Sequence, residues 1–176
     1  EKRGGNTVTR TATSAVSKWL VKVEAAISKK EIKAAAKLFK KECFWRDLVS
    51  FTWNIKTLES REEIEAMLAA TLAEVKPSKW KIDGKASVAE GATEAWFTFE
   101  TAVSRGRGHI RLKGDKCWTL LTTMVELKGH EEPAGSRRPL GSEHTAVKDR
   151  KNWLQLKQEN EARLGYEEQP YCVIIG

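Results

Sequence analysis

Apolar residues recur at helical spacing in the first part of the chain. Residues 1–12 are polar and contain two glycines, so we expect a flexible N-terminal segment there. A first helix is predicted over 13–27 from the apolar stripe Trp19, Val23, Ala26 and Ile27. Ser28 and Glu31 have the spacing of a capping box. A second helix is predicted after them from Ile32, Ala35, Ala36 and Phe39.

The clearest helix signal follows Ser60. Ser60 and Glu63 form another capping-box pattern, and Pro77 ends the periodic stretch. The residues at 3.6-residue spacing are Ile64, Met67, Leu68, Thr71, Leu72 and Val75. A dense aromatic stretch over 44–53 precedes this third helix.

After Pro77 the pattern changes from helix to strand. Strands are predicted over 80–82, 94–103, 109–112 and 117–127. Turns are predicted at 83–84, 106–108 and 113–115 from their Gly and Asp residues. Three helices followed by an antiparallel meander indicate an α+β domain, with the helices packed on one face of a curved sheet. Such a sheet encloses a cone, and the open end of a cone offers a pocket.

Composition changes again beyond the meander. Residues 129–150 are rich in Gly, Pro, Glu, Arg and Ser, which is typical of a connector, and a charged helix is predicted over 147–164. Residues 171–176, a β-branched run that ends in Gly176, resemble the first strand of a dinucleotide-binding βαβ unit. The predicted organisation is a flexible segment, a cone domain, a linker with a charged docking helix, and a truncated strand: 1–12, 13–128, 129–165 and 166–176.

Charge and cysteine content narrow the class of protein. The net charge is +7, and residues 1–40, with ten Lys or Arg against three Glu, account for all of it. These are mostly lysines on predicted helix faces, so we interpret them as a solvated surface and expect no nucleic-acid partner. The three widely spaced cysteines Cys43, Cys117 and Cys172 indicate buried thiols in a cytoplasmic protein. No apolar run reaches the about 20 residues that span a bilayer.

Several short motifs, taken in order and spacing, resemble one protein family. They are 43–48 (CFWRDL), 51–54 (FTWN), 57–62 (TLESRE), 118–123 (WTLLTT), 126–131 (ELKGHE), 137–139 (RRP), 141–145 (GSEHT) and 165–166 (GY). The chain from about Trp19 to Gly176 resembles the N-terminal part of a group of flavin-containing monooxygenases. In these proteins a domain similar to nuclear transport factor 2 and to SnoaL-like cyclases precedes the core that binds FAD and NAD(P)H.

The resemblance implies a fragment that ends where the flavin domain begins. Gly176 would be the first glycine of an incomplete Gly-rich turn, so this stretch alone is expected to bind no cofactor. FAD and NAD(P)H are implied for the parent protein. The implied partner is the chain's own C-terminal flavin domain.

The resemblance also implies candidates for chemistry inside the cone. Relatives of this fold include isomerases and dehydratases that use a pocket Asp, sometimes with a His, and a carboxylate among aromatic walls becomes a usable general base. Asp47 and His109 are the catalytic candidates here. The candidate lining is Trp45, Trp53, Trp96 and Trp118. The alternatives are an ion pair of Asp47 with Arg46, a solvent-facing His109, and tryptophans that belong to the core.

Other chemistries find less support in the sequence. His130 and His144, with the neighbouring residues Glu131, Glu132 and Glu143, match no compact metal-ligand signature, so no metal site is expected. Ser142 and Cys117 lack a base at motif spacing, which argues against a nucleophile.

Three hypotheses therefore stand. The first is an accessory domain of a flavin-dependent monooxygenase that oxygenates a small organic substrate. The second is a self-sufficient small-molecule pocket of the isomerase or dehydratase kind that uses Asp47. The third is an interaction module, for example a homodimer formed through the sheet face.

Overall fold

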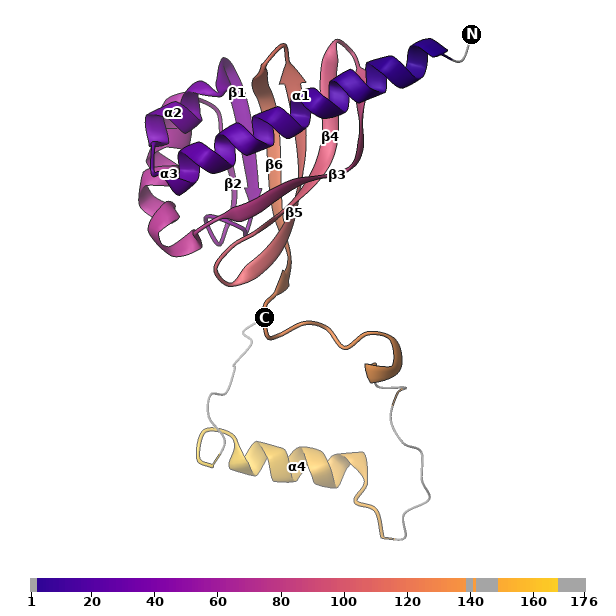
Figure 1. The fold of residues 1–176 in the computed structure, drawn as a ribbon. Helices are drawn as coiled ribbons and strands as arrows, with labels where there is room; N and C mark the ends of the chain where they lie inside the picture. Colours follow the sequence, from indigo (N-terminus) through magenta and orange to yellow (C-terminus); the bar gives the residue numbers. More distant parts are fainter. Residues whose placement is uncertain (1–2, 139–140, 142–148, 168–176) are drawn as a thin grey trace. The chain divides into compact units, whose positions relative to one another are not determined.

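The computed structural model of the chain describes residues 3–138, 141 and 149–167, with side chains from residue 8 onward. The chain divides into a cone unit, Glu1–Glu132, and a C-terminal unit, Pro133–Gly176, and each is described by itself. The cone unit contains α1 (Arg3–Ser28), α2 (Ile32–Lys37), β1 (Phe39–Leu48), β2 (Ile55–Leu58), α3 (Arg61–Val75), β3 (Ser78–Ala89), β4 (Ala92–Glu100), β5 (Ser104–Lys113) and β6 (Lys116–Leu127) (Figure 1).

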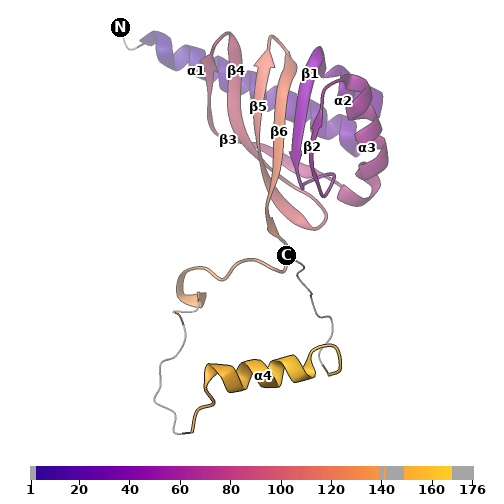
Figure 2. The same cartoon turned by 180° about the vertical axis from the view of Figure 1, so that it is seen from behind.

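The six strands form one curved sheet in the order β2-β1-β6-β5-β4-β3. The helix α1 crosses one face of this sheet, and the opposite face has no helix of the cone unit on it (Figures 1 and 2). The predicted α+β fold is confirmed, but the sheet is not wholly antiparallel. The β1–β6 pair is parallel whereas the other pairs are antiparallel, because the hairpins of the meander fix the direction in which β6 arrives beside β1.

The first helix is longer than its predicted range, because α1 begins at Arg3 and not at Thr13. Its apolar stripe extends toward the N-terminus through the buried residues Ala12 and Val16. The hydroxyl of Thr13 also accepts a hydrogen bond from the N–H of Ala86 in β3 at 3.1 Å. Packing of this early part on the sheet therefore stabilises a helix where local composition favours a loose segment.

The two predicted capping boxes have different outcomes. Ser28 is the last residue of α1, and Glu31 precedes α2 without a side-chain cap, so that prediction is wrong. Lys30 instead turns the chain with a φ of 59°. Ser60 does cap α3, since its hydroxyl accepts the N–H of Glu63 at 3.2 Å.

The aromatic stretch over 44–53 contains the end of β1 and the β1–β2 loop, which the helical and strand patterns did not reveal. Alternate residues of β1 are buried and exposed, as expected for a strand with one face on the core. Cys43, Trp45 and Asp47 point inward, whereas Phe44 and Arg46 are exposed.

The glycines at 106 and 108 were wrongly predicted to form a turn. Both lie inside β5, where a Cβ on Gly106 would overlap the ring of Phe99 and a Cβ on Gly108 would overlap the ring of Phe97. Close packing of rings against backbone, not a reversal of the chain, therefore requires glycine here. The predicted turn at 83–84 is an irregularity within β3, and the chain reverses at 90–91 instead.

The C-terminal unit contains a 3-10 turn over Gly135–Arg137 and the helix α4 (Trp153–Arg163). A charged helix is confirmed within the predicted range 147–164, although residues 149–152 are not helical. Asn152 with Gln155 forms the capping box of α4. Most of the predicted last strand, including Gly176, lies outside the described residues. Among the described helices, none is long and apolar enough to cross a membrane.

Candidate functional site

Aromatic rings occupy the space between the helices and the concave face of the sheet. Successive rings have centroids 5.1–6.5 Å apart and form one connected cluster. Its members, all buried, are Trp19, Phe39, Trp45, Phe51, Trp80, Phe97 and Phe99. The side of the sheet where the resemblance places a pocket is therefore largely filled by core packing.

Asp47 lies on this inner side, and its carboxylate is fully buried. One oxygen, Oδ2, accepts the N–H groups of Phe51 and Thr52 at 3.0 and 2.8 Å and the Thr52 hydroxyl at 2.8 Å. The other, Oδ1, accepts the hydroxyl of Thr122 at 2.8 Å. The indole N–H of Trp45 donates in turn to Thr122 at 2.9 Å. Four donors satisfy the buried charge, so both oxygens are engaged in holding neighbouring groups.

These bonds hold a strained loop between β1 and β2. Val49 and Trp53 have φ angles of 57° and 52°, which are unfavourable for residues with bulky side chains. The N–H of Val49 donates to the carbonyl of Asn54 at 3.0 Å and closes the loop. Asp47 receives its donors from inside this loop, and the arrangement gives the carboxylate a structural task.

His109 lies on the opposite, outer face of the sheet. It pairs across the sheet with Leu121, while Asp47 pairs with Thr122, and consecutive strand residues point to opposite faces. Asp47 and His109 therefore do not form one constellation. The His109 ring lies 4.8 Å from that of Trp96. Burial has the largest effect on the pKa of His109 and lowers it. The nearby Glu94 raises this pKa, and Arg111 lowers it.

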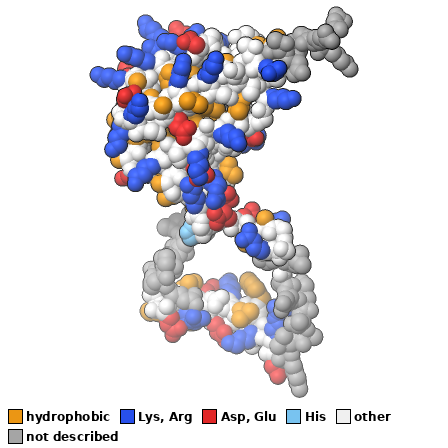
Figure 3. Space-filling view, viewed as in Figure 1, with side chains coloured by type: hydrophobic (Ala, Val, Ile, Leu, Met, Phe, Trp, Pro, Cys, Tyr) orange, Lys and Arg blue, Asp and Glu red, His pale blue; other side chains and the backbone are white. Residues whose placement is uncertain are grey.

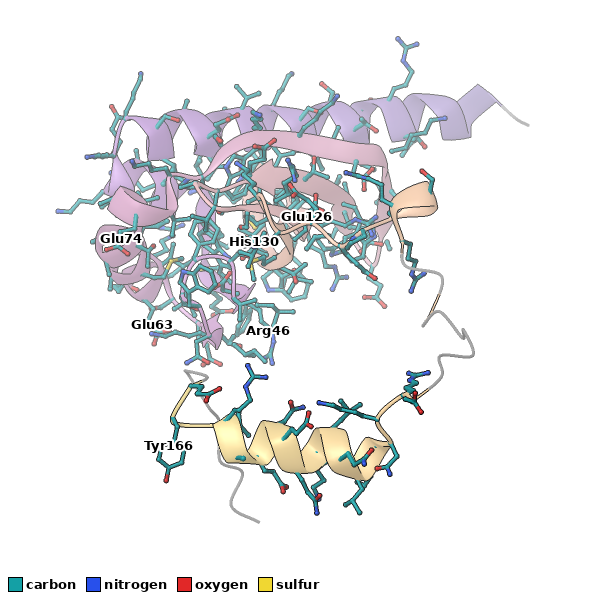
Figure 4. All side chains as sticks on the ribbon, turned by 90° about the horizontal axis from the view of Figure 1, so that it is seen from below. Arg46, Glu63, Glu74, Glu126, His130 and Tyr166 are labelled. Carbon is teal, nitrogen blue, oxygen red and sulfur yellow. The ribbon has the colours of Figure 1, made fainter. Side chains whose placement is uncertain are left out.

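The four candidate tryptophans are not brought together. Trp45 belongs to the core, and Trp53 is 61% exposed in the β1–β2 loop. Trp96 and Trp118 are on the outer face, where the guanidinium of Arg107 lies 4.4 Å from the Trp96 ring centroid. Arg46 also projects from this face, on the side away from α1 (Figure 4). A homodimer through the outer face stays a prediction.

The remaining candidates offer no reactive centre in the described residues. Burial raises the pKa of both Cys43 and Cys117, which favours the unreactive thiol form. Glu131 pairs with Arg105 at 2.8 Å. No group of three or more His, Cys, Asp or Glu in the described part of the chain is placed to hold a metal ion. Glu143, His144 and Gly176 lie outside that part.

A pocket of about 590 Å³ lies between α1 and the β5–β6 turn, and Trp19 of the aromatic cluster borders it. The helix contributes Arg10, Thr11, Ser14, Ala15, Lys18, Trp19 and Lys22. The end of β5 and the turn contribute Leu112, Gly114 and Asp115. We call this site the α1 pocket. Figure 3 shows the face that carries α1, on which Lys and Arg side chains are prominent.

One signal for the α1 pocket is present in the sequence. The excess of basic residues over 1–40 was interpreted as a solvated helix face, and three of these residues, Arg10, Lys18 and Lys22, line the pocket. Helical periodicity alone cannot identify them, because the pocket exists only where the β5–β6 turn approaches α1.

No protein-family model and no curated protein matches this sequence, whereas solved structures are similar in fold. A domain of unknown function with a cystatin-like fold from Nostoc punctiforme PCC 73102 has a TM-score of 0.52 at 17% identity, over 66% of this chain and 78% of that one. A hypothetical protein with a ketosteroid isomerase-like fold from Catenulispora acidiphila DSM 44928 has a TM-score of 0.45 at 16% identity, over 59% and 82%. An NTF2-like protein of unknown function from Cytophaga hutchinsonii ATCC 33406 has a TM-score of 0.42 at 11% identity, over 61% and 87%.

The first similarity shows the fold alone. It agrees with the α+β cone that the sequence resemblance implied. The flavin-containing monooxygenase parent, with its FAD and NAD(P)H, stays a prediction.

Replacing Asp47 should test its structural task. We expect Asp47→Ala to lower the free energy of unfolding by about 3 kcal/mol or more, because it leaves buried donors without acceptors. Asp47→Asn should cost less, since one oxygen remains. Urea denaturation measures both, and Asp83→Ala, which removes an exposed aspartate, should change stability by about 1 kcal/mol at most. An unchanged stability of Asp47→Ala would contradict the assignment.

His109 should make stability depend on pH. Its folded pKa is below the ordinary value of 6.5, so the unfolded chain binds more protons between the two values. The free energy of unfolding should therefore decrease as pH falls through 6.5 toward the folded pKa. Denaturation profiles of the protein and of His109→Gln, compared over this interval, isolate the effect. Parallel profiles would show that the imidazole is not protected from protonation.

Proposed function

We propose that the cone unit is a small-molecule-binding module whose ligand occupies the α1 pocket. The observation that carries the proposal is the pocket itself, about 590 Å³ in volume and bordered by the buried Trp19 and Leu112 together with polar side chains. Ligand sites of this size combine apolar walls with a few polar groups that orient the bound molecule.

Neither of the catalytic candidates is placed to act as a general base, which favours a binding function over acid–base catalysis. General-base catalysis requires a carboxylate or imidazole within hydrogen-bonding reach of the substrate. Asp47 already accepts four hydrogen bonds, and His109 is on the other side of the sheet. We therefore assign Asp47 to the fold and place the ligand in the α1 pocket, which neither Asp47 nor His109 lines.

A second candidate function follows from the sequence resemblance and from α4. In this proposal the cone unit precedes a flavin-dependent oxygenase domain, and the C-terminal unit contacts that domain. The apolar residues Trp153, Leu154 and Leu156 of α4 favour it, because the C-terminal unit by itself does not bury them.

Filling the α1 pocket should abolish binding. Ala15 is half-buried at the pocket, so Ala15→Trp places an indole in the space that the ligand needs. We expect 2-naphthalenemethanol, a neutral aromatic probe, to shift amide resonances of α1 and the β5–β6 turn in the unmodified chain, and to shift none in Ala15→Trp.

The matched control for this experiment is Ala25→Trp, because Ala25 is exposed on the same helix and does not line the pocket. It should bind the probe as the unmodified chain does. Thermal unfolding of both variants verifies that they fold. Equal binding by Ala15→Trp would refute this location of the site.

The flavin-domain proposal predicts the coding sequence after Gly176. The reading frame should continue into a glycine-rich turn followed by a helix. Sequencing of the gene decides this, and a stop codon at that point would remove the second candidate.

A further inference from the structure

We infer that the α1 pocket selects an organic anion with an apolar body, such as an aromatic carboxylate or an organic phosphate. The inference rests on the proposed function, since it names the class of ligand for the same site. Three cationic side chains, those of Arg10, Lys18 and Lys22, border the pocket, and Asp115 is the one acidic residue among its lining. The pocket is therefore electropositive, and a concave site concentrates such a field.

Among the described residues, the three cations of the pocket have no acidic partner, unlike Arg105 and Arg107 on the outer sheet face. Within the described residues, Arg10, Lys18 and Lys22 form no ion pair or side-chain hydrogen bond. On the outer face, Arg107 pairs with Asp83 at 3.1 Å and Arg105 pairs with Glu126 at 2.9 Å. An anion would therefore find free positive charge in the pocket, whereas Arg105 and Arg107 on the outer face already have acidic partners.

The spacing of the three cations indicates where the anionic group binds. Lys18 and Lys22 are one helical turn apart, about 6 Å along the axis, so two ammonium groups can reach one carboxylate or phosphate. Arg10 lies about 18 Å from Lys22 along the helix. Ala15, Trp19 and Leu112 provide the apolar lining. The geometry fits a ligand whose apolar body contacts this surface and whose charged end lies at the lysine pair.

The lysine pair also carries a local cost. Like charges at i and i+4 repel on a helix, and no acidic residue stands three or four positions from Lys18 or Lys22 to offset the repulsion. A bound anion would remove that repulsion. A pair of residues that lowers the local stability of its own helix is expected at a binding site.

A pair of probes that differ only in charge tests the inference on the full chain. The probes are 2-naphthoate and the neutral 2-naphthalenemethanol, which share one ring system, and dissociation constants come from amide-shift titrations. We expect the carboxylate to bind about tenfold more tightly, as charge-assisted contacts to two ammonium groups allow. Its advantage should decrease as sodium chloride is raised.

Variants separate this inference from the proposed function. Lys18→Gln/Lys22→Gln should weaken 2-naphthoate binding about tenfold and leave the neutral probe within about twofold. Lys37→Gln/Lys56→Gln removes two exposed lysines that do not line the pocket, and should leave both probes unchanged.

The outcomes distinguish the two proposals. Equal binding of the two probes, or an undiminished preference for 2-naphthoate in Lys18→Gln/Lys22→Gln, overturns the anion inference and leaves the proposed function standing. Failure of both probes to bind the unmodified chain, or binding that Ala15→Trp does not affect, overturns the proposed function.

Discussion

Packing of seven aromatic rings between α1 and the sheet is the constraint on which the rest of the cone unit depends. The rings of Phe97 and Phe99 reach the β5 backbone only because Gly108 and Gly106 have no side chains. The same packing buries the inner face of β1, including Asp47. The core thus largely fills the volume in which the sequence resemblance implied a pocket. An open pocket lies instead where α1 meets the β5–β6 turn.

The buried carboxylate of Asp47 follows from this packing. A buried carboxylate must be stabilised by hydrogen-bond donors. The β1–β2 loop and β6 supply these donors. The donors come from two elements that flank β1, so the side chain joins the loop to the parallel β1–β6 pair. This explains how Val49 and Trp53 keep unfavourable backbone angles in the loop. A polar residue inside an aromatic cluster can thus look catalytic in sequence and be structural.

Much of the fold was predictable because helical periodicity is a local property. The apolar stripe of α3 and its cap at Ser60 are complete within 16 residues, Ser60 to Val75. The prediction of a turn at Gly106 and Gly108 is wrong because a glycine required by a turn and a glycine required beneath an aromatic ring look the same in the local sequence. The separation of Asp47 from His109 depends on strand register, which pairs Asp47 with Thr122, 75 positions along the chain. No local pattern contains that information.

The α1 pocket, like the separation of Asp47 from His109, could not be predicted from a local sequence pattern. A cluster of lysines on a helix is usually solvated, and composition alone gives no reason to single out Lys18 and Lys22. Their significance arises from tertiary structure, since the β5–β6 turn converts one face of an exposed helix into one wall of a pocket. On the outer face the strands bring acids beside Arg105, Arg107 and Arg111, so their positive charge is paired within the fold. Beside α1 positive charge is left available, and this contrast is the physical reason to look for the ligand there.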